Sequence, residues 1–243
     1  MKQAIILCSG GMDSVVTSNY VRKKLKNKYG RIIVLFFDYG QRTLLWERKA
    51  SKKCALDIHA EFKEIKLNEL KKISTSLINS NKKARKVSRN ELKDTKEESL
   101  KYYVPARNTM FLIYALAIAE SDFVKFKRKS DIFVGFKNEG RESYPDTTQK
   151  FVNQINKLQK QAVIGTFKII APLIKKDKED IVKLGEKLNV RLENTYSCYV
   201  GSKDAHCGYC LSCRLRQEGF YWSGIKDKTK YKIKMKGVKD VCH

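Results

Sequence analysis

The sequence predicts an α/β fold of the Rossmann-like kind, in which helices cover both faces of a parallel sheet. From the N-terminus to Ile65, apolar runs of strand type alternate with segments of helical periodicity, and this order is the signature of a wound parallel sheet. The apolar runs are continuous, as expected for strands that are buried on both faces. With 243 residues, the chain is long enough for one large domain that carries an appendage.

Three strands and two helices are expected in the first part of the chain. The runs KQAIILC and RIIVLFFD predict strands at residues 2–8 and 31–38, and a third strand is expected at 58–65. Apolar side chains recur at helical spacing over residues 14–29, and a second helix is expected over residues 42–56. A glycine-rich turn therefore joins the first strand to the first helix.

The remaining elements are expected after a polar interruption. Residues 71–101 are charge-mixed and poor in aromatic side chains, and we interpret most of them as a mobile loop or a weak helix. An apolar helix follows Pro105, and then come a strand in DIFVGF (131–136), a Pro-led helix (144–163), a strand in FKIIAPL (167–173) and an amphipathic helix (175–189). The basic tail KDKTKYKIKMKG alternates with period two, which favours an edge strand.

The charge of the chain is strongly positive. Fifty-one Lys and Arg residues stand against 26 Asp and Glu residues, a formal net charge of +25, so an acidic partner such as nucleotide or nucleic acid has to be considered. The lysines are scattered over nearly every segment, which favours a Lys-rich proteome slightly over nucleic-acid binding. No apolar run approaches the roughly 20 residues of a membrane span, and the N-terminus lacks a signal-peptide pattern. We therefore expect a cytoplasmic protein with no membrane partner.

The stretch SGGMDS, between the first strand and the first helix, is the strongest local signal. In open parallel sheets ligands bind at the carboxyl ends of the strands. Gly10 and Gly11 can take positive φ and allow a phosphate to approach the main chain, and the start of the next helix favours an anion. Asp13 beside a phosphate is expected to bind a divalent cation such as Mg²⁺, or alternatively to cap the helix. There is neither a Walker A pattern nor a GxGxxG pattern.

The C-terminal part of the chain carries a cysteine cluster. Cys198, Cys207, Cys210 and Cys213 have the spacing C-x8-C-x2-C-x2-C, which predicts one tetrahedral Zn²⁺ site in which Gly208 allows a tight knuckle. Four thiolates close such a site, so we expect a structural role, although His206 could replace one ligand. The other cysteines, Cys8, Cys54 and Cys242, are expected to be ordinary core or tail residues.

These motifs resemble known families. SGGMDS is similar to the PP-motif of the N-type ATP pyrophosphatases, which implies a HUP-type fold, cleavage of ATP between its α and β phosphates, and Mg²⁺ as a bridge. The cysteine cluster followed by RLRQEGF, together with FDYGQR, VPARNTMFLIYALAIAE, SYPDTTQKFV, APLIKKDKEDI and TYSCY, resembles the 7-cyano-7-deazaguanine synthase family from residue 5 to residue 220. That resemblance implies an ATP-dependent ligase of queuosine biosynthesis, with 7-carboxy-7-deazaguanine and ammonia as substrates and with acyl-adenylate and amide intermediates.

The resemblance also implies roles for individual residues. Ser9, Gly10, Gly11, Asp13 and Ser14 match the pyrophosphate-binding motif, and we expect the whole stretch Leu7, Cys8, Ser9, Gly10, Gly11, Met12, Asp13 and Ser14 to bind ATP. Asp13 and Lys178 are the expected catalytic residues, with Lys178 neutralising the phosphates. Arg107, Asn108, Tyr144 and Asp146 are the expected substrate-binding residues. A carboxylate such as Asp146 can accept hydrogen bonds from a guanine-like edge.

The chain departs from the family pattern at several positions. Ala106 replaces a usual Gly, Thr43 replaces a usual His, Thr147 and Thr148 replace Cys-Arg, and the loop before Tyr144 reads NEGRES. The altered loop motivates one alternative, a ligase that delivers the adenylated carboxylate to another amine such as that of a protein. The net charge of +25 favours a second, a tRNA-modifying PP-loop enzyme, and a non-enzymatic zinc-knuckle RNA binder is the third. We expect a PP-loop domain at residues 1–195 with a zinc-binding segment at 196–243 packed on it. A homodimer is compatible with the sequence.

Overall fold

A parallel sheet forms the centre of the molecule. The structure is a computed structural model that describes residues 1–137, 144–201 and 205–234. The strands are β1 (Lys2–Leu7), β2 (Tyr29–Asp38), β3 (Glu61–Lys66), β4 (Ser130–Phe133) and β5 (Lys168–Ile170). Their order in the five-stranded sheet is β3-β2-β1-β4-β5, and every neighbouring pair is parallel. The α/β fold predicted from the sequence is therefore confirmed.

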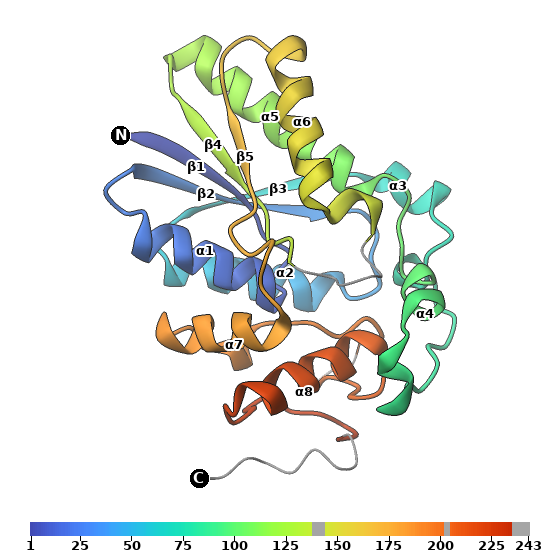
Figure 1. The fold of residues 1–243 in the computed structure, drawn as a ribbon. Helices are drawn as coiled ribbons and strands as arrows, with labels where there is room; N and C mark the ends of the chain where they lie inside the picture. The colour runs from blue at the N-terminus through green and yellow to red at the C-terminus, as the bar shows by residue number, and fades with distance from the viewer. Residues whose placement is uncertain (138–143, 202–204, 235–243) are drawn as a thin grey trace.

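Alternating side chains of the central strand β1 pack on the two faces of the sheet. Ala4 and Ile6 belong to one buried cluster, and Ile5 belongs to the other. Helices α1 (Met12–Lys24) and α2 (Leu44–Asp57) cover the first face, whereas α5 (Arg107–Phe126) and α6 (Gln149–Ala162) cover the opposite face (Figure 1). Because the chain leaves β1 toward β2 and later returns on the other side as β4, the order of strands reverses between β1 and β4, where such folds form a ligand crevice.

A third layer lies outside α1. Helices α7 (Lys178–Lys187) and α8 (Leu211–Ser223) pack on each other below the first face of the sheet (Figure 1). Met12 and Val16 of α1 share one buried cluster with Ile181 of α7 and Phe220 of α8. The short 3-10 helices η4 (Pro145–Thr147) and η5 (Leu192–Asn194) precede α6 and the cysteine segment. Helix α8 was not predicted from the sequence.

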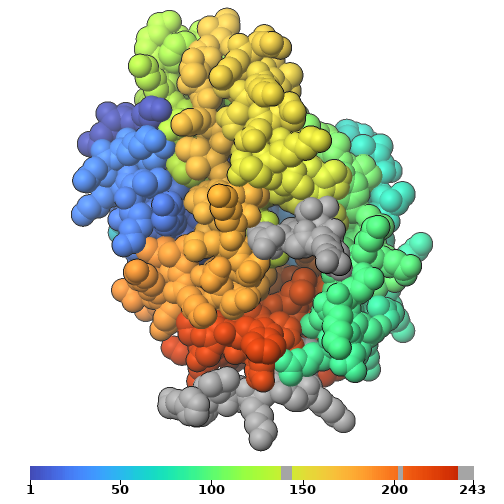
Figure 2. Space-filling model, in the orientation of Figure 1, coloured from blue at the N-terminus to red at the C-terminus, as the bar shows by residue number. Residues whose placement is uncertain are grey.

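The polar segment after β3 is packed rather than free. It contains only the short helices α3 (Asn68–Ile73), η1 (Leu77–Asn79), η2 (Asn90–Lys93) and α4 (Lys96–Leu100). Val87 is buried, its N–H donates to the carbonyl of Tyr209, and its carbonyl accepts from Arg214 Nε. Figure 2 shows this segment (green) lying against the C-terminal helix (red). The prediction of irregular structure is confirmed, but the prediction of a mobile loop is wrong for the residues around Val87.

Other expectations need adjustment at their boundaries. The first helix begins at Met12 and ends at Lys24, and Tyr29 belongs to β2. In the tail, the edge strand expected from the alternation of basic residues is not formed up to residue 234: only an isolated bridge joins His206 to Tyr231, and the rest of the tail lies outside the described residues. Among the described residues, no helix has both the length and the apolar composition that crossing a bilayer requires.

Candidate active site

The turn between β1 and α1 is built around Gly10. Its φ is +80°, and a Cβ there would lie 2.5 Å from the carbonyl oxygen of Glu47 and 2.9 Å from the amide nitrogen of Ser51. On the same side, Ser51 Oγ donates to the carbonyl of Cys8 at 2.8 Å. Gly10 therefore allows α2 to pack directly against the turn, a close approach that a side chain would prevent.

Gly11 has a different role from the one expected. Its backbone is extended, with φ −70° and ψ 158°, and it is the N-cap of α1 without a capping side chain among the described residues. Ser9 Oγ accepts from the Gly11 N–H at 3.3 Å, and Ser14 Oγ donates to the Gly11 carbonyl at 3.0 Å. The prediction of positive φ is thus confirmed for Gly10 and wrong for Gly11. The uncapped start of α1 presents main-chain N–H groups to the crevice, which favours an anion.

Asp13 and Lys178 form an ion pair at this helix start. Lys178 Nζ donates to both carboxylate oxygens of Asp13, each at 2.8 Å. The alternative that Asp13 caps the helix is wrong, because the cap position is Gly11. Gly219 of α8 makes room for the lysine, since a Cβ there would lie 2.4 Å from Lys178 Cγ. The aliphatic part of the Lys178 side chain therefore packs against α8, and its ammonium group binds Asp13.

A second group of predicted residues lies at the start of α5. The Asn108 N–H donates to Asp146 Oδ2 at 3.3 Å, and Asn108 Nδ2 donates to the Asp146 carbonyl at 3.4 Å. Asp146 is buried, its Oδ1 has no hydrogen-bond partner within the part of the chain that the structure describes, and burial raises its pKa. Arg107 Nη1 donates to the hydroxyl of Tyr39 at 3.4 Å. Tyr144 donates from its hydroxyl to the carbonyl of Ser99 at 2.8 Å.

One open cavity of about 300 Å³ connects the two groups. Its wall includes most of the predicted site residues: Leu7, Cys8, Ser9, Gly11, Met12, Asp13, Ser14, Arg107, Asn108, Tyr144 and Lys178. Gly10 and Asp146 lie just behind the wall, since their neighbours line the cavity and they do not. The structure thus brings the phosphate-loop residues and the substrate-site residues of the sequence analysis into one space.

Several residues of the wall were missed by sequence reasoning. Phe37 and Phe111 are stacked with ring centroids 4.0 Å apart, and Tyr39 lies beside them. Glu47 of α2 and Arg216 of α8 also line the cavity. The signal for Phe37 and Tyr39 is the stretch FDYGQR, which spans the carboxyl end of β2. Aromatic rings and a few polar groups are what a planar heterocyclic ligand requires.

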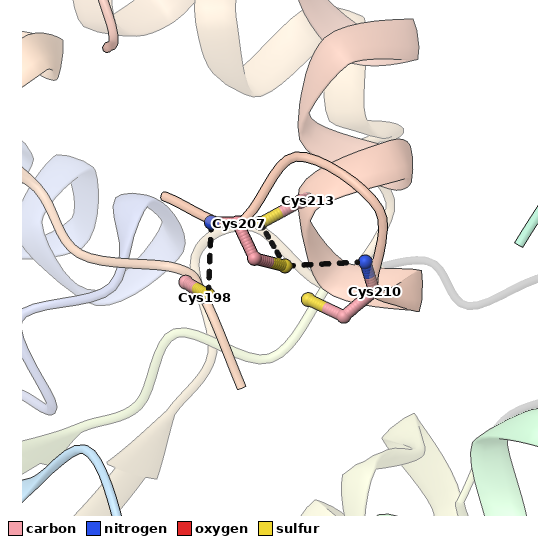
Figure 3. Close-up of side chains that lie close together, drawn as sticks. All are labelled: Cys198, Cys207, Cys210 and Cys213. Carbon is pink, nitrogen blue, oxygen red and sulfur yellow. Dashed lines mark hydrogen bonds between the residues drawn. The ribbon is translucent and has the colours of Figure 1, made fainter. Parts of the chain in front are cut away.

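The four cysteines converge as predicted. Cys198, Cys207, Cys210 and Cys213 are buried, and their Sγ atoms all lie within 4.8 Å of one another (Figure 3). Sγ of Cys207 and Sγ of Cys213 are 3.8 Å apart, which is about the edge of a tetrahedron with Zn–S bonds near 2.3 Å. The cluster can therefore hold a metal such as zinc. Gly208 has φ +79°, and a Cβ there would meet the Ile233 carbonyl at 1.7 Å.

The neighbours of the cluster indicate thiolates. The Cys207 N–H donates to Sγ of Cys198 at 3.4 Å, the Cys210 N–H donates to Sγ of Cys207 at 3.3 Å (Figure 3), and hydrogen bonds from the other thiols hold the pKa of Cys198 well below its usual value. His206 is not an additional ligand, because its Nε2 accepts from the Ser197 N–H at 3.0 Å.

Cys8 and Cys54 are both buried, as expected, but they are also in contact. The hydrogen bond between their thiols lowers the pKa of Cys8 to about 6, although burial acts in the opposite direction. Cys242 lies outside the described residues.

Comparisons with known proteins assign the family. The family model described as "Queuosine biosynthesis protein QueC" matches residues 3–224. The chain belongs to this family. Curated relatives named "7-cyano-7-deazaguanine synthase" include those of Nitratiruptor sp., 40% identical over 95% of this chain and 99% of theirs, and of Methanosphaera stadtmanae, 37% identical over 94% and 98%. A solved structure of NMN synthetase from Francisella tularensis is more distant, with a TM-score of 0.42 and 11% identity over 93% of this chain and 79% of that one.

The structure explains how this QueC family member accommodates its departures from the usual pattern. Ala106 has φ +52°, a left-handed conformation that explains why Gly is usual there. The hydroxyl of Thr43 donates to Glu47. Thr147 donates to the carbonyl of Tyr144 at 3.0 Å, and Thr148 caps α6 by accepting from the Phe151 N–H at 3.0 Å. The altered loop NEGRES, residues 138–143, lies outside the described residues.

Proposed function

We propose that this protein converts 7-carboxy-7-deazaguanine and ammonia to 7-cyano-7-deazaguanine at the expense of ATP, which is cleaved to AMP and pyrophosphate. The observation that carries the proposal is the single cavity that joins the loop around Asp13 to Arg107 and Asn108. It occurs in a member of the QueC family whose curated relatives bear the name of the nitrile-forming enzyme.

The pyrophosphate portion of ATP binds at the start of α1. The uncapped N–H groups of this helix and the hydroxyls of Ser9 and Ser14 supply donors, and the helix dipole adds a partial positive charge. Lys178 contributes a full positive charge within reach of the same phosphates. Because the side-chain ammonium group of Lys178 also binds Asp13, the position of Lys178 is fixed before ATP binds.

The deazaguanine binds at the other end of the cavity. The stacked rings of Phe37 and Phe111 form an apolar wall, and Arg107, Asn108 and Tyr144 supply polar contacts. Asp146 lies directly behind Asn108, and its Oδ1 lacks a donor among the described residues. An amino edge of the base would satisfy that oxygen if the wall in front of Asp146 moves when the base binds, and on that basis we assign Asp146 as the acceptor for the guanine-like edge.

The reaction has two activation steps. A carboxylate oxygen of the substrate attacks the α phosphorus of ATP, pyrophosphate leaves, and ammonia then displaces AMP to form the amide. In the second activation the amide oxygen attacks another ATP, and loss of AMP together with the two N–H protons gives the nitrile. The protein contributes mainly by positioning the reactants and stabilising charge on the phosphates.

Two metals belong to the proposal. Asp13 faces the phosphate end of the cavity, and each of its oxygens retains a lone pair beyond the bond to Lys178, so the carboxylate suits a hard cation such as Mg²⁺. Mg²⁺ would neutralise charge on the phosphates. The four thiolates suit Zn²⁺, and because they fill a tetrahedral site completely, we assign that ion a structural role.

The test is a reaction of the purified protein with MgATP, ammonium and 7-carboxy-7-deazaguanine, in which AMP, pyrophosphate and product mass are followed. We expect AMP at each activation step, with the amide preceding the nitrile. AMP release that requires tRNA or a protein acceptor, without amide or nitrile, would contradict the proposal and favour the alternatives raised by the altered loop and the +25 charge. Asp13→Asn should abolish AMP formation while the zinc content stays unchanged.

A further inference from the structure

The carboxyl group of Glu47 belongs to the cavity wall, and the proposed function assigns it no role. Among the described residues that line the cavity, the carboxylic side chains are Asp13 and Glu47. Asp13 is bound through both oxygens by Lys178 at the phosphate end. Glu47 has no ion-pair partner within hydrogen-bond distance in the described part of the chain. A half-buried acid in a ligand cavity is a candidate for a functional role.

The position of Glu47 is at the junction of the two ligand sites. Its own main-chain carbonyl lies against Gly10 of the phosphate loop. Its side chain interacts electrostatically with Tyr39 and Arg107 of the deazaguanine end. The carbon that receives the nitrogen nucleophile is attached to the base and, after activation, to AMP, so it must also lie at this junction.

The carboxyl group is held in place by its neighbours. Gln41 Nε2 donates to Glu47 Oε2 at 3.2 Å, and Thr43 Oγ1 donates to Glu47 Oε1. The amide of Gln41 is itself fixed, because Nε2 also donates to the Phe37 carbonyl at 3.0 Å and Oε1 accepts from the Tyr39 N–H at 2.9 Å. Each carboxylate oxygen therefore accepts one bond from the protein and keeps capacity for an N–H donor from a ligand.

Burial raises the pKa of Glu47, while the hydrogen bonds from Thr43 and Gln41 and the positive charge of Arg107 act in the opposite direction. Tyr39 and Arg107 are the other titratable groups that interact with it. A carboxylate with a raised pKa is a stronger base than an exposed one, and it gains more from a cation that enters the cavity.

We propose that Glu47 is the ammonium subsite of this enzyme and the base that converts ammonium to ammonia for attack on the acyl-adenylate. This inference rests on the proposed function. Ammonium has no free electron pair, so it must lose a proton before it can act as a nucleophile. The carboxylate takes this proton, the nitrogen pair forms the C–N bond, and the C–O bond to AMP breaks with its electrons staying on AMP. The second proton lost by nitrogen goes to water.

The experiment separates adenylation from nitrogen transfer in the full-length enzyme. Exchange of labelled pyrophosphate into ATP, in the presence of 7-carboxy-7-deazaguanine and without ammonium, reports adenylation alone. Amide formation as a function of ammonium concentration reports the second step. In Glu47→Gln we expect exchange to remain within about twofold of wild type, whereas kcat/KM for ammonium falls by about 10²–10⁴-fold, the usual contribution of a general base.

Matched variants and nucleophiles sharpen the result. Asp57→Asn, at the exposed end of the same helix α2, should leave both steps unchanged. Hydroxylamine is largely unprotonated at neutral pH and needs no base to free its electron pair, so Glu47→Gln should still form the hydroxamate. Raising the pH should partly restore amide formation in Glu47→Gln, because free ammonia accumulates in solution.

Two outcomes would overturn the subsite. Wild-type kcat/KM for ammonium in Glu47→Gln would show that the carboxylate is not needed, and a parallel loss of exchange would assign it to ATP or its cation. If Glu47→Gln fails to fold, as judged by thermal melting, Glu47→Asp is used instead: the retracted carboxylate should weaken ammonium use selectively, and equal loss of both steps would again reject the subsite. Absence of substrate-dependent exchange in the wild type would instead reject the proposed function itself.

Discussion

The ammonium group of Lys178 lies 2.8 Å from both carboxylate oxygens of Asp13, a residue 165 positions earlier in the chain. The two residues come from the starts of α7 and α1. Their meeting depends on a third helix, because Lys178 passes over α8 at Gly219, where a Cβ would lie 2.4 Å from Lys178 Cγ.

Removing the positive charge of Lys178 should impair adenylation. We expect Lys178→Met to lower AMP formation by about 10²–10³-fold, the usual cost of losing one preorganised group that stabilises developing charge. Gly219→Ala should reduce AMP formation by displacing Lys178, and it should have little additional effect in the Lys178→Met background, as a double-mutant cycle can measure. Lys183→Met, at an exposed position of the same helix, is the control. Additive losses would show that Gly219 acts independently of Lys178.

The two glycines of the phosphate loop should differ in their effect on stability. In Gly10→Ala the residue must keep φ +80° or move, and its Cβ meets the backbone of α2, so we expect a loss of at least about 1–2 kcal/mol in the free energy of unfolding. Gly11 has φ −70°, and Gly11→Ala should change stability by no more than about 0.5 kcal/mol. Denaturant melts of both variants measure the difference, and equal losses would contradict the assigned backbone conformations.

Asp146 should make the fold less stable as the pH rises. Burial raises its pKa in the folded state above the ordinary value of 3.8, so the stability it contributes is complete below that pH and is lost as the pH rises through the folded-state pKa. Asp146→Asn should therefore be the more stable protein at neutral pH, by about 1–2 kcal/mol, and lose this advantage in acid. Its KM for 7-carboxy-7-deazaguanine should rise, because the amide replaces an acceptor by a donor.

Denaturant melts from acidic to neutral pH check that prediction. Asp57→Asn, which alters an exposed carboxylate, should leave the pH dependence of the wild type in place. A constant difference between Asp146→Asn and wild type at all pH values would show that the carboxyl of Asp146 is not perturbed by burial.

The cysteine cluster should bind one metal ion per chain and stabilise the C-terminal segment. Cys210→Ala should abolish metal binding and lower Tm by about 2–4 °C for each kcal/mol that is lost, since α8 begins next to this residue. Cys54→Ala, which removes a buried thiol outside the cluster, should retain the full metal content. Elemental analysis and thermal melting measure both effects. A metal-free Cys210→Ala protein with wild-type Tm would contradict the structural role.

The elements predicted correctly are those whose signal is local. Continuous apolar runs marked β1 and β2, and the alternation of strands and helices gave their parallel order. Boundaries were less accurate where long-range contacts decide them. Tyr29 lies at the end of a helical pattern, yet it begins β2 because its hydroxyl donates to Asp131 of β4 at 2.6 Å. Such a bond between distant positions leaves no trace in local periodicity.

In the candidate site, too, residues in short sequence patterns were predicted, whereas residues placed by long-range contacts were not. The cysteine spacing and the SGGMDS stretch are short patterns, and the structure brings their residues together. Glu47 and Arg216 were missed, because only tertiary packing decides which side of α2 or α8 faces the cavity. Arg216 is almost fully buried and donates to the hydroxyl of Thr195 and to the carbonyl of Leu192, each at 2.7 Å, and nothing in the stretch RLRQEGF distinguishes it from an exposed arginine.

The wall of the cavity includes residues from both ends of the sequence, among them Ser9 and Ser14 around the start of α1 and Leu211 and Arg216 of α8. During synthesis the phosphate loop leaves the ribosome first, and Lys178 and its support on α8 follow only when translation is nearly complete. At about 5–20 residues per second, this interval is roughly 10–40 s. A nascent chain therefore carries an incomplete candidate ATP site for most of its synthesis, and we expect a prematurely terminated fragment to be inactive.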